Sequence, residues 1–438
     1  MYLQTIGHAS ILIRDVNYCP ILLTDPWLVG SAYWRSWWIQ NYPNKNLRDE
    51  LQKVPTIYIT HEHPDHFHMP SIRTLGNTPQ YLFPDLPETG FISYLRSHDF
   101  KAGVIKPREW KFIHPSVAIL SLPVLIDDSV LLIETPTSFI ANFNDAKASV
   151  RLMKTVSKTA KQSRKKFILL SSYSSASIVN SFRRSGKTVS IVSKKGFVKH
   201  INKSCNIMKP DIFIPFASQV IFKRDDSKWA NEYKVTFEDI KNGWDSKTTL
   251  LHPYTTLDLN SFCSEFVSVD DYEGPGERAS SLGKAQEQID RNQSLSKVDE
   301  DKLEEKMKKF SFVFRLMFPS GIGFRLENQS YTISWKGKCS LKKGLSANIK
   351  FVIDIPPGAL KDAINNGHFG DLQITMFTIV HMSDRNADPR LIFIFFVLLT
   401  LDEYGHFRGF RQFFRWVKSI FVQFVSLRLF PIKSSGLN

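Results

Sequence analysis

Residues 60–68 read Thr60-His61-Glu62-His63-Pro64-Asp65-His66-Phe67-His68 and follow an apolar run that starts at Thr56. The apolar run predicts a buried β-strand, so imidazoles and carboxylates collect at a strand end. Neutral imidazole is a frequent ligand of first-row metal ions near pH 7. On an extended segment His61 and His63 point to the same side and can chelate one ion. After the turn at Pro64, Asp65 and His66 can face a neighbouring ion. The stretch therefore predicts a metal centre.

His-x-His-x-Asp-His at a strand end is the hallmark of the metallo-β-lactamase fold. The N-terminal half of the chain resembles the metallo-β-lactamase-like half of the CMP-N-acetylneuraminic acid hydroxylase family. It is more loosely similar to ascorbate-phosphate lactonases and N-acylphosphatidylethanolamine phospholipase D. The matching segments are Gly7-His8-Ala9, Thr24–Gly30 (TDPWLVG) with Trp37-Trp38, 59–66, Asn142–Asp145 (NFND), Ile214–Ala217 (IPFA) and 366–388 around Gly370-Asp371-Leu372.

The motif and the resemblance together name the expected metal ligands: His61, His63, Asp65, His66 and Asp145. Asp145 stands where the fold supplies a metal-bridging aspartate. Asp65 is also the expected catalytic residue, because it either holds the metal or takes a proton from water. Three protein ligands and a water suffice for a catalytic ion. The cofactor is therefore expected to be zinc or iron, as one or two ions.

The sequence departs from the family pattern at three places. No histidine stands in the few residues before Asp128, and 220–224 (VIFKR) replaces a late histidine. The four cysteines lie far apart, so the ligand set of the hydroxylase's Rieske iron–sulfur domain is not found here. By residue type alone, substitutes for the missing ligands are Asp127, His114, His200 and His252, although no spacing places them at the site.

Further residues near these motifs each have two interpretations. His8 either donates a hydrogen bond to a ligand or is an ordinary buried histidine. Asp25 either orients a metal-ligating histidine or caps the turn before Pro26. A tryptophan group is either a platform that binds a sugar or base ring of the substrate, or part of the core: Trp27, Trp37 and Trp38.

The alternation of strand-like runs with helix-compatible segments predicts an α/β protein. We expect an αββα metallo-β-lactamase sandwich over residues 1–265 and a polar connector, flexible or helical, over 266–309. A small C-terminal α+β module over 310–402 and a basic aromatic tail over 403–438 follow. Composition excludes a disordered chain, a collagen-like fibre and a coiled coil.

The chain carries a net charge of +15, which favours anionic partners. Between Arg151 and His200 stand 13 Lys or Arg and no acid, which indicates either a solvated helix face or a basic wall beside the ligand site. A signal peptide and a run long enough to span a bilayer are not found, so a cytoplasmic location is expected. Nucleic acid is an unlikely partner, since no nucleic-acid module is visible.

Residues 404–438 carry six Lys or Arg, no acid and a row of phenylalanines at helical spacing. Such a helix is typical of proteins that lie on the inner face of an anionic membrane. The alternative is a terminal helix that packs on the protein through its phenylalanines.

These features favour a metallo-hydrolase that acts on an anionic small molecule: a nucleotide sugar, phosphoester or lactone. One alternative is an iron-dependent hydroxylase of a sialic-acid-like sugar nucleotide, which requires a separate electron donor. The other is a non-catalytic, membrane-associated scaffold whose metal site has decayed.

Overall fold

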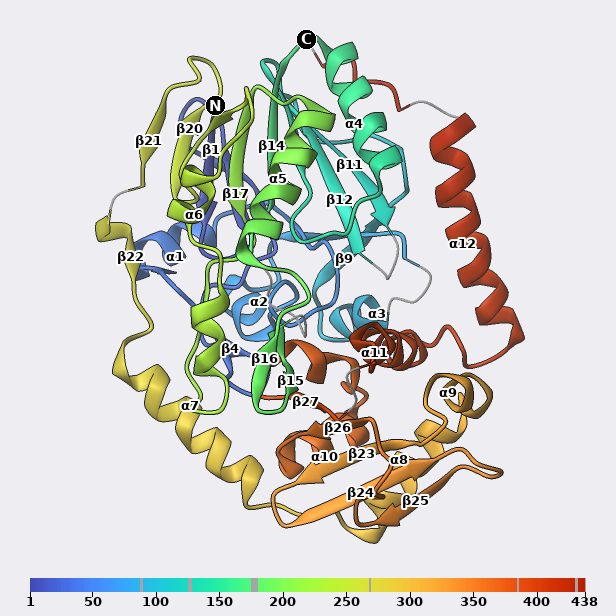
Figure 1. The fold of residues 1–438 in the computed structure, drawn as a ribbon. Coiled ribbons are helices and arrows are strands. Elements are labelled where there is room, and N and C mark those ends of the chain that lie inside the picture. Colours follow the sequence, from blue (N-terminus) through green and yellow to red (C-terminus); the bar gives the residue numbers. More distant parts are fainter. Residues whose placement is uncertain are drawn as a thin grey trace.

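The computed structural model describes residues 1–86, 90–124, 128–174, 180–267, 269–383, 386–429 and 432–437, with the backbone only of 269 and 422–429. Its N-terminal part is built around two mixed β-sheets (Figure 1). The first runs in the order β21 (Ser264–Phe266), β20 (Thr255–Asp258), β1 (Tyr2–Ile6), β2 (Ser10–Arg14), β3 (Pro20–Thr24), β7 (Thr56–Tyr58), β8 (Gln80–Pro84), β9 (Lys101–Ile105). The second runs β10 (Lys111–His114), β11 (Val117–Val124), β12 (Asp128–Glu134), β13 (Ser138–Asn142), β14 (Lys166–Ser172), β17 (Ile212–Phe216), β19 (Thr249–Leu250).

The two sheets face each other across one apolar core. Inward side chains of both sheets meet there, among them Leu3 and Ile13 of the first and Ile119 and Ile168 of the second. The outer face of the first sheet is covered by α1 (Lys45–Leu51), α2 (Met69–Leu75) and α3 (Gly90–Ser97). The outer face of the second is covered by α4 (Val150–Ser163), α5 (Lys194–Met208) and α6 (Phe237–Asn242). The predicted α/β class with layered mixed sheets is confirmed.

A third sheet forms the core of the C-terminal part. Its order is β16 (Lys187–Val189), β15 (Phe182–Arg184), β27 (Ile379–Met382), β26 (Phe351–Asp354), β23 (Ile322–Leu326), β24 (Gln329–Ser334), β25 (Ser340–Lys343). Strands β15 and β16 come from the N-terminal half, so this sheet is not built from residues 310–402 alone. The helices around it are α8 (Lys297–Lys308), α9 (Ser311–Met317), α10 (Pro357–Asn366) and α11 (Pro389–Glu403).

Short elements join the two parts. Strands β18 (Val220–Phe222), β5 (Trp37–Ile39) and β4 (Ser31–Ala32) make one ribbon, and β22 (Tyr272–Glu273) pairs with β6 (Tyr42–Pro43). Helix α7 (Gly276–Arg291) runs along the outside from the sandwich to the third sheet (Figure 1). Helix α12 (Phe410–Leu429) lies at the opposite side, and residues 432–437 then return to the sandwich.

The basic stretch 151–200 does not form one wall beside the strand-end motifs. Arg164, Lys165 and Lys166 lie where β14 begins, whereas the motif residues follow strands at their carboxyl ends. Seven residues of strand span roughly 23 Å. Lys165 pairs with the buried Glu134 at 3.0 Å, and Lys166 pairs with Asp211 at 3.3 Å. The hypothesis that these three residues border the ligand site is wrong, because they stabilise the far end of the sandwich.

Candidate metal centre

The metal-motif loop connects β7 to α2 and is held by its own backbone. The amides of His66 and Phe67 both donate to the carbonyl of His63, which closes a tight turn after Pro64. His68 ends the loop as the N-cap of α2 and accepts from the Ser71 amide at 3.3 Å. Burial lowers the pKa of His68 to about 4, so it stays a neutral acceptor. The last histidine of the stretch is therefore used to start a helix.

The two sheets are fastened to each other beneath this loop. Asp25, which follows β3, accepts from the Thr60 amide at 2.7 Å. Asn144, which follows β13, donates to the Thr60 hydroxyl at 2.8 Å. Asp25 and Asn144 both have positive φ values, +39° and +45°. Strained backbone of this kind persists where the surrounding contacts over-determine it, as at ligand sites.

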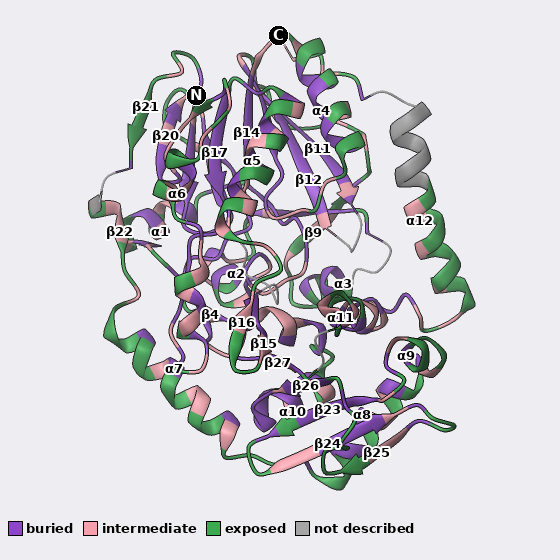
Figure 2. Cartoon of the chain, in the orientation of Figure 1, coloured by how far each residue is buried: buried purple, intermediate pink, exposed green. Residues whose placement is uncertain are grey.

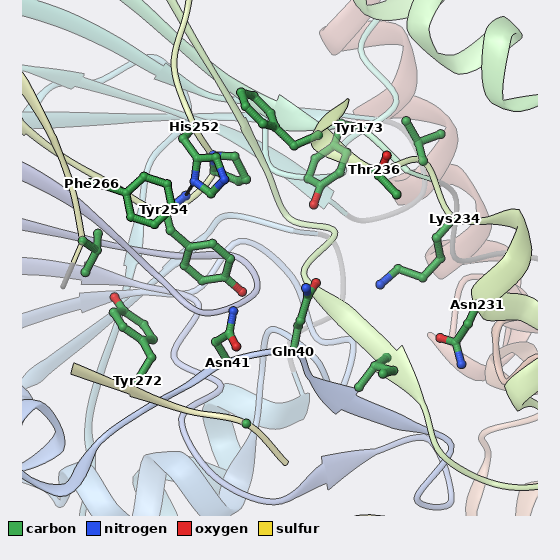
Figure 3. A pocket seen from close by; sticks show the side chains of 16 residues that line it. Gln40, Asn41, Tyr173, Asn231, Lys234, Thr236, His252, Tyr254, Phe266 and Tyr272 are labelled. Carbon is green, nitrogen blue, oxygen red and sulfur yellow. Dashed lines mark hydrogen bonds between the residues drawn. The ribbon is translucent and has the colours of Figure 1, made fainter. Parts of the chain in front are cut away.

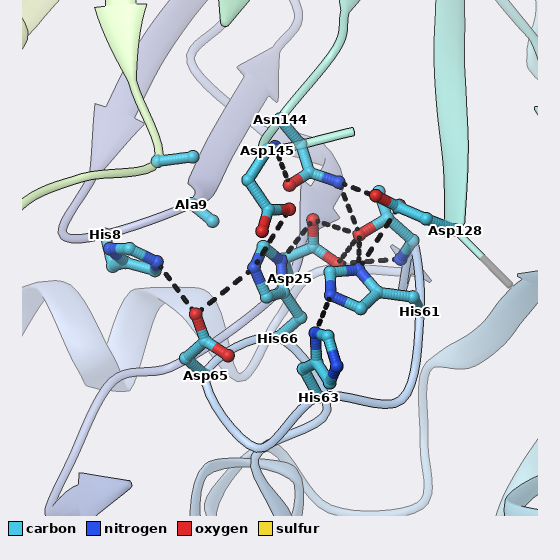
Figure 4. Close-up of polar contacts among 12 residues, drawn as sticks. His8, Ala9, Asp25, His61, His63, Asp65, His66, Asp128, Asn144 and Asp145 are labelled. Carbon is cyan, nitrogen blue, oxygen red and sulfur yellow. Dashed lines mark hydrogen bonds and ion pairs between the residues drawn. The ribbon is translucent and has the colours of Figure 1, made fainter. Parts of the chain in front are cut away.

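Two groups of three side chains can each hold one metal ion: His8, Asp65 and His66; and His61, His66 and Asp145. Within each group the ligand atoms lie within 4.8 Å of one another. His66 belongs to both. Its Nε2 lies 3.3 Å from Asp65 Oδ2 and 3.5 Å from Asp145 Oδ1 (Figure 4).

Several polar atoms of these groups are arranged to bind a cation, because the protein offers them no hydrogen-bond partner. Both ring nitrogens of His66 and the Oδ1 atom of Asp145 are buried and make no hydrogen bond. Buried polar atoms are almost always hydrogen-bonded, so each such atom calls for an explanation. A metal ion held between imidazole nitrogen and carboxylate oxygen provides one, since these are common ligands of zinc and iron.

Opposing charges set the protonation of the cluster. Burial works against the ionised forms, yet His66 holds the pKa of Asp65 well below its usual range. Likewise His66 and His61 lower the pKa of Asp145 to about 2 despite its burial. Burial, together with His66 and His63, lowers the pKa of His61 well below its usual value. Burial opposes a charged His66, yet Asp65, Asp145 and Asp25 raise its pKa well above the usual value. The cluster thus presents ionised carboxylates and a neutral His61, and a metal ion bound at His66 would displace the proton of its ring.

Two carboxyl groups outside the ligand groups, those of Asp25 and Asp128, contact the imidazole rings of His66 and His61. Asp25 Oδ2 lies 3.3 Å from His66 Nδ1, and Asp128 Oδ1 lies 3.3 Å from His61 Nδ1. Both contacts engage the Nδ1 side of the ring. Nε2 of His66 then faces Asp65 and Asp145, whereas Nε2 of His61 faces His63 Nδ1 at 2.8 Å. Carboxylate–imidazole pairs of this type fix the tautomer of metal-binding histidines. The expected role of Asp25 has this geometry, and Asp128 was not expected.

His63 lies beside His61 but in neither group of three. Its Nδ1 is 2.8 Å from His61 Nε2, and burial lowers its pKa. His8 is buried, and its Nε2 lies 3.1 Å from Asp65 Oδ2. The contact with Asp65 has the geometry of the first interpretation of His8, and its buried Nδ1 has no hydrogen-bond partner. The role of His8 at the site stays a prediction.

Tyr33 and Asp371 are two further residues that were not among the expected site residues, although Asp371 lies in a segment that resembles the hydroxylase family. The Tyr33 hydroxyl donates to Asp65 Oδ1 at 2.5 Å, and burial with the Asp65 charge raises the pKa of Tyr33 well above its usual value. Burial, then Glu403, Glu62 and Asp65, raise the pKa of Asp371. Tyr33 stands between Ala32 and Trp34, and no spacing distinguished it. Asp371 comes from the C-terminal part, and its carboxyl group feels the negative charge of Asp65.

The three expected substrate-binding tryptophans are buried: Trp27, Trp37 and Trp38. They belong to one apolar cluster with Tyr33 and Phe222. Trp27 and Trp37 lie edge-on to the His8 ring, at 5.7 and 6.3 Å between centroids. Trp27 and Trp37 thus pack beside the metal centre. Contact of the three tryptophans with a substrate stays a prediction.

The substitutes considered for the missing ligands do not join these groups. His114 belongs to β10, His200 to the outer helix α5, and His252 to a cavity described below. Asp127 lies outside the described residues. At the position of the late histidine, β18 pairs with β5, and Trp37 and Trp38 lie opposite its residues.

A cavity of about 630 Å³ opens at the same end of the sandwich (Figure 3). Its wall includes Tyr173, which follows β14, whereas Asp145 follows the neighbouring β13. The adjoining backbone is shared, since Ser172 donates to the Asn144 carbonyl at 2.7 Å. Within the described lining, no residue belongs to either group of metal ligands.

The cavity is aromatic and carries one amine. Its described lining contains no Asp or Glu, and its rings are those of Tyr173, Phe237, His252, Tyr254, Phe266 and Tyr272. Lys234 points into it and donates to the carbonyl of Val220 (Figure 3). Burial lowers the pKa of Lys234 to about 8, which keeps most of the amine protonated at pH 7. A cavity of this kind favours an anion that carries a ring.

Sequence comparison relates part of the chain to known hydroxylases. No family model matches. A stretch of 80 residues is 40% identical to cytidine monophosphate-N-acetylneuraminic acid hydroxylase of Asterias rubens, covering 18% of this chain and 11% of that protein. The hydroxylase of Sus scrofa is 32% identical over 80 residues, 16% of this chain and 18% of that protein. The chain thus matches less than one fifth of the length of these relatives.

Structure comparison returns proteins of low sequence identity. CmlA, a diiron β-hydroxylase from Streptomyces venezuelae, has a TM-score of 0.39, 15% identity and coverage of 58% of this chain and 53% of its own. Zinc-bound PqqB from Methylobacterium extorquens has a TM-score of 0.33, 12% identity and coverage of 59% and 100%. The layered sheets, the strand-end motif and the matched stretch define a metallo-β-lactamase fold. Within that fold, the chain is partly similar to the metallo-β-lactamase-like region of CMP-N-acetylneuraminic acid hydroxylase.

Proposed function

We propose that this protein is a metal-dependent hydrolase of an anionic small molecule: a nucleotide sugar, a phosphoester or a lactone. The observation that carries the proposal is the buried pair of ligand groups that share His66, with unbonded nitrogen and oxygen atoms facing each other. A metal ion bound there would act as a Lewis acid and lower the pKa of water toward neutrality.

The geometry favours one ion per chain. His66 Nδ1 faces Asp25, so Nε2 is its free ligand atom. One imidazole nitrogen offers one lone pair and binds one metal ion. The two groups therefore compete for His66, and one ion occupies either the His8–Asp65 side or the His61–Asp145 side.

The chain's own residues have separate roles in this proposal. Asp65 acts as a ligand more than as a base, because a carboxylate with a low pKa is a weak proton acceptor near pH 7. Tyr33 holds Asp65 in place. Asp25 and Asp128 hold the two imidazoles with Nε2 facing inward. Lys234 and the rings around it bind the part of the substrate that does not react.

A second candidate function rests on the sequence match to hydroxylases. An iron-dependent hydroxylase of a sialic-acid-like sugar nucleotide would use the same ligands and the same cavity. It would need a separate electron donor, because the cysteines of this chain are far apart and form no iron–sulfur ligand set.

Metal content separates these functions. The purified protein is analysed for zinc and iron, alongside the variant H61A/H63A and the control H98A, which removes an exposed histidine on another surface. The hydrolase requires zinc in wild type and H98A, loss of part of it in H61A/H63A, and a parallel decrease in hydrolysis of phosphoester, lactone and CMP-sugar substrates. Bound iron without hydrolysis favours the hydroxylase. A wild-type protein that binds neither metal, even after incubation with both, contradicts both enzymes and favours the scaffold.

A further inference from the structure

Helix α12 turns its most apolar residues away from the protein. Phe410, Phe414 and Phe421 are 79%, 53% and 65% exposed, and Val417 between them is 39% exposed. These four positions fall within roughly 60° of one another at 100° per residue. They define the outer face of α12. Exposed large apolar groups that cluster in this way mark an interaction site more often than ordinary surface.

The other side of the helix faces the protein. Trp416 stacks on His406 at 5.7 Å between ring centroids and meets Phe407 edge-on. Ser419 and Ile420 on the same side are partly covered. The hypothesis that the phenylalanines dock the helix on the protein is therefore wrong for Phe410, Phe414 and Phe421.

Both ends of α12 are fixed to the protein. At its start, Phe407 packs against Phe310 at 5.3 Å in the C-terminal core. Beyond its end, Ile432 is buried against the second sheet of the sandwich. The Ser435 amide donates to Glu134 Oε2 at 2.6 Å. Helix α12 thus connects two cores and is attached to one at each end (Figure 2). These attachments hold its outer face towards solvent without any partner bound to that face.

The charges beside the outer face are all positive. Arg411, Arg415 and Lys418 are exposed and lie along one border of this face. Residues 404–438 contain no acid. The acids just before the helix are already paired, Glu403 with Lys306 at 2.5 Å and Asp402 with Lys309.

Helix α9 carries a second exposed apolar and basic patch near the start of α12. Phe312 and Leu316 are 77% and 70% exposed, and Arg315 between them is exposed as well. The helix carries no acid over Ser311–Met317. It lies on the same side of the molecule as the start of α12, to which Phe310 and Phe407 connect it (Figure 1).

We infer that the outer face of α12, together with α9, docks this protein on an anionic lipid surface. The phenylalanines enter the boundary between headgroups and acyl chains, and the cations meet the lipid phosphates and carboxylates. Charge complementarity favours this occupant over a second copy of the chain, since two copies of so positive a face repel each other. No helix within the described residues is long and apolar enough to cross a bilayer, so the docking is peripheral.

Co-sedimentation of the full chain with vesicles tests the inference. Wild-type protein is expected to bind phosphatidylserine–phosphatidylcholine vesicles, to bind phosphatidylcholine alone weakly, and to lose binding as salt rises. R411E/R415E/K418E is expected to bind at least a hundred-fold more weakly, since each cation contributes roughly five-fold. F410S/F421S is expected to bind both kinds of vesicle more weakly.

Matched controls carry the same changes on other surfaces. K45E/K53E/R73E reverses three exposed cations, on α1, in the turn after it and on α2, and V16S/I289S replaces two residues that are 62% and 53% exposed. Both controls should bind vesicles like wild type. All variants should keep the wild-type melting temperature, because the altered side chains are exposed.

Three outcomes would overturn the inference. The first is a wild-type protein that ignores anionic vesicles. The second is equal loss of binding in the control variants, which would indicate attraction by net charge alone. The third is a dimer in sedimentation velocity that F410S/F421S dissociates, without vesicle binding, which would assign the face to a second copy. Metal content and hydrolysis do not enter this test, so it stands apart from the proposed function.

Discussion

The metal centre and α12 depart from ordinary burial in opposite directions. At the metal centre, His66 and Asp65 are buried, and the two ring nitrogens of His66 face carboxylate oxygens at 3.3–3.5 Å without a well-aligned hydrogen bond. On α12, Phe410 and Phe421 are mostly exposed although the protein has apolar cores at both ends of the helix. Buried polar atoms without partners and grouped exposed aromatics both cost free energy in an isolated chain.

The difference between the two regions indicates what kind of partner each of them binds. The metal centre calls for a cation, because its lone pairs and carboxylates converge on common points. The outer face of α12 calls for an apolar surface of negative charge, because its rings and cations face outward together. A small ion can bind inside the metal centre, whereas the outer face of α12 can be covered only by another large structure.

The largest effect is expected at the residue that both ligand groups share. H66A should remove nearly all bound metal, while H8A and H61A should each remove only part, since each leaves one group of three intact. Metal analysis of the three folded variants measures this order. Equal metal loss in all three would contradict the shared role of His66.

Substitution of a buried residue beyond the end of α12 and of an exposed residue on its outer face should change the stability of the protein by different amounts. I432A should lower the free energy of unfolding by about 2–4 kcal/mol, because Ile432 is buried where the chain returns to the sandwich. F421A should change it by less than about 0.5 kcal/mol, as for an exposed residue. Urea unfolding of both variants gives the two values. A large loss in F421A would mean that the helix packs on the protein through its outer face.

A smaller effect on metal affinity is expected from Asp25, which contacts the Nδ1 side of His66. D25N keeps the shape of the side chain but removes the negative charge beside His66 Nδ1. Loss of such a partner typically weakens metal binding about 10- to 100-fold. Competition with a chelator measures the affinity. D99N is the control, because Asp99 is exposed and also has a positive φ that Asn adopts readily.

The smallest effect is expected in the aromatic cavity. K234M should weaken binding of an anionic ligand such as CMP about ten-fold, which corresponds to about 1.4 kcal/mol. Because burial lowers the pKa of Lys234 to about 8, wild-type affinity should fall as pH rises from 7 to 9. K234M should lose this pH dependence, and the exposed control K241M should keep it.

The same pKa shift acts on stability with the opposite sign. Unfolding returns the pKa of Lys234 to its ordinary value of 10.5, so between about pH 8 and 10.5 the unfolded chain binds the proton more tightly than the folded one. Stability contributed by this group therefore rises with pH across that window. Denaturation of wild type and K234M at pH 7 and pH 10 measures it.

Local patterns predicted much of the sandwich. The apolar runs Tyr2–Ile6 and Ser10–Arg14 form β1 and β2, and the apolar run 117–122 lies within β11. Helix α2 begins at Met69, one residue before Pro70, because His68 caps it. Such elements follow from side-chain period and from capping, which are properties of neighbouring residues.

Other parts of the molecule have no local signal. Strands β15 and β16 are three residues each and join the sheet of the C-terminal part through pairing with β27. Tyr33 reaches Asp65 from a separate segment, and Asp371 of the C-terminal part feels the charge of Asp65. The cluster Arg164–Lys166 looked like a ligand wall by composition, yet its place at the start of β14 depends on strand direction.

By itself the sequence determined the class of fold and the chemistry of its centre, because a strand end that carries His61, His63, Asp65 and His66 concentrates metal ligands within a few residues. It also determined that the tail is an amphipathic cationic helix. Only the tertiary structure decided that His66 is shared by two ligand groups and that Asp128 orients His61. It alone decided which side of α12 faces outward, because helical period fixes the two faces but not which of them the rest of the chain covers.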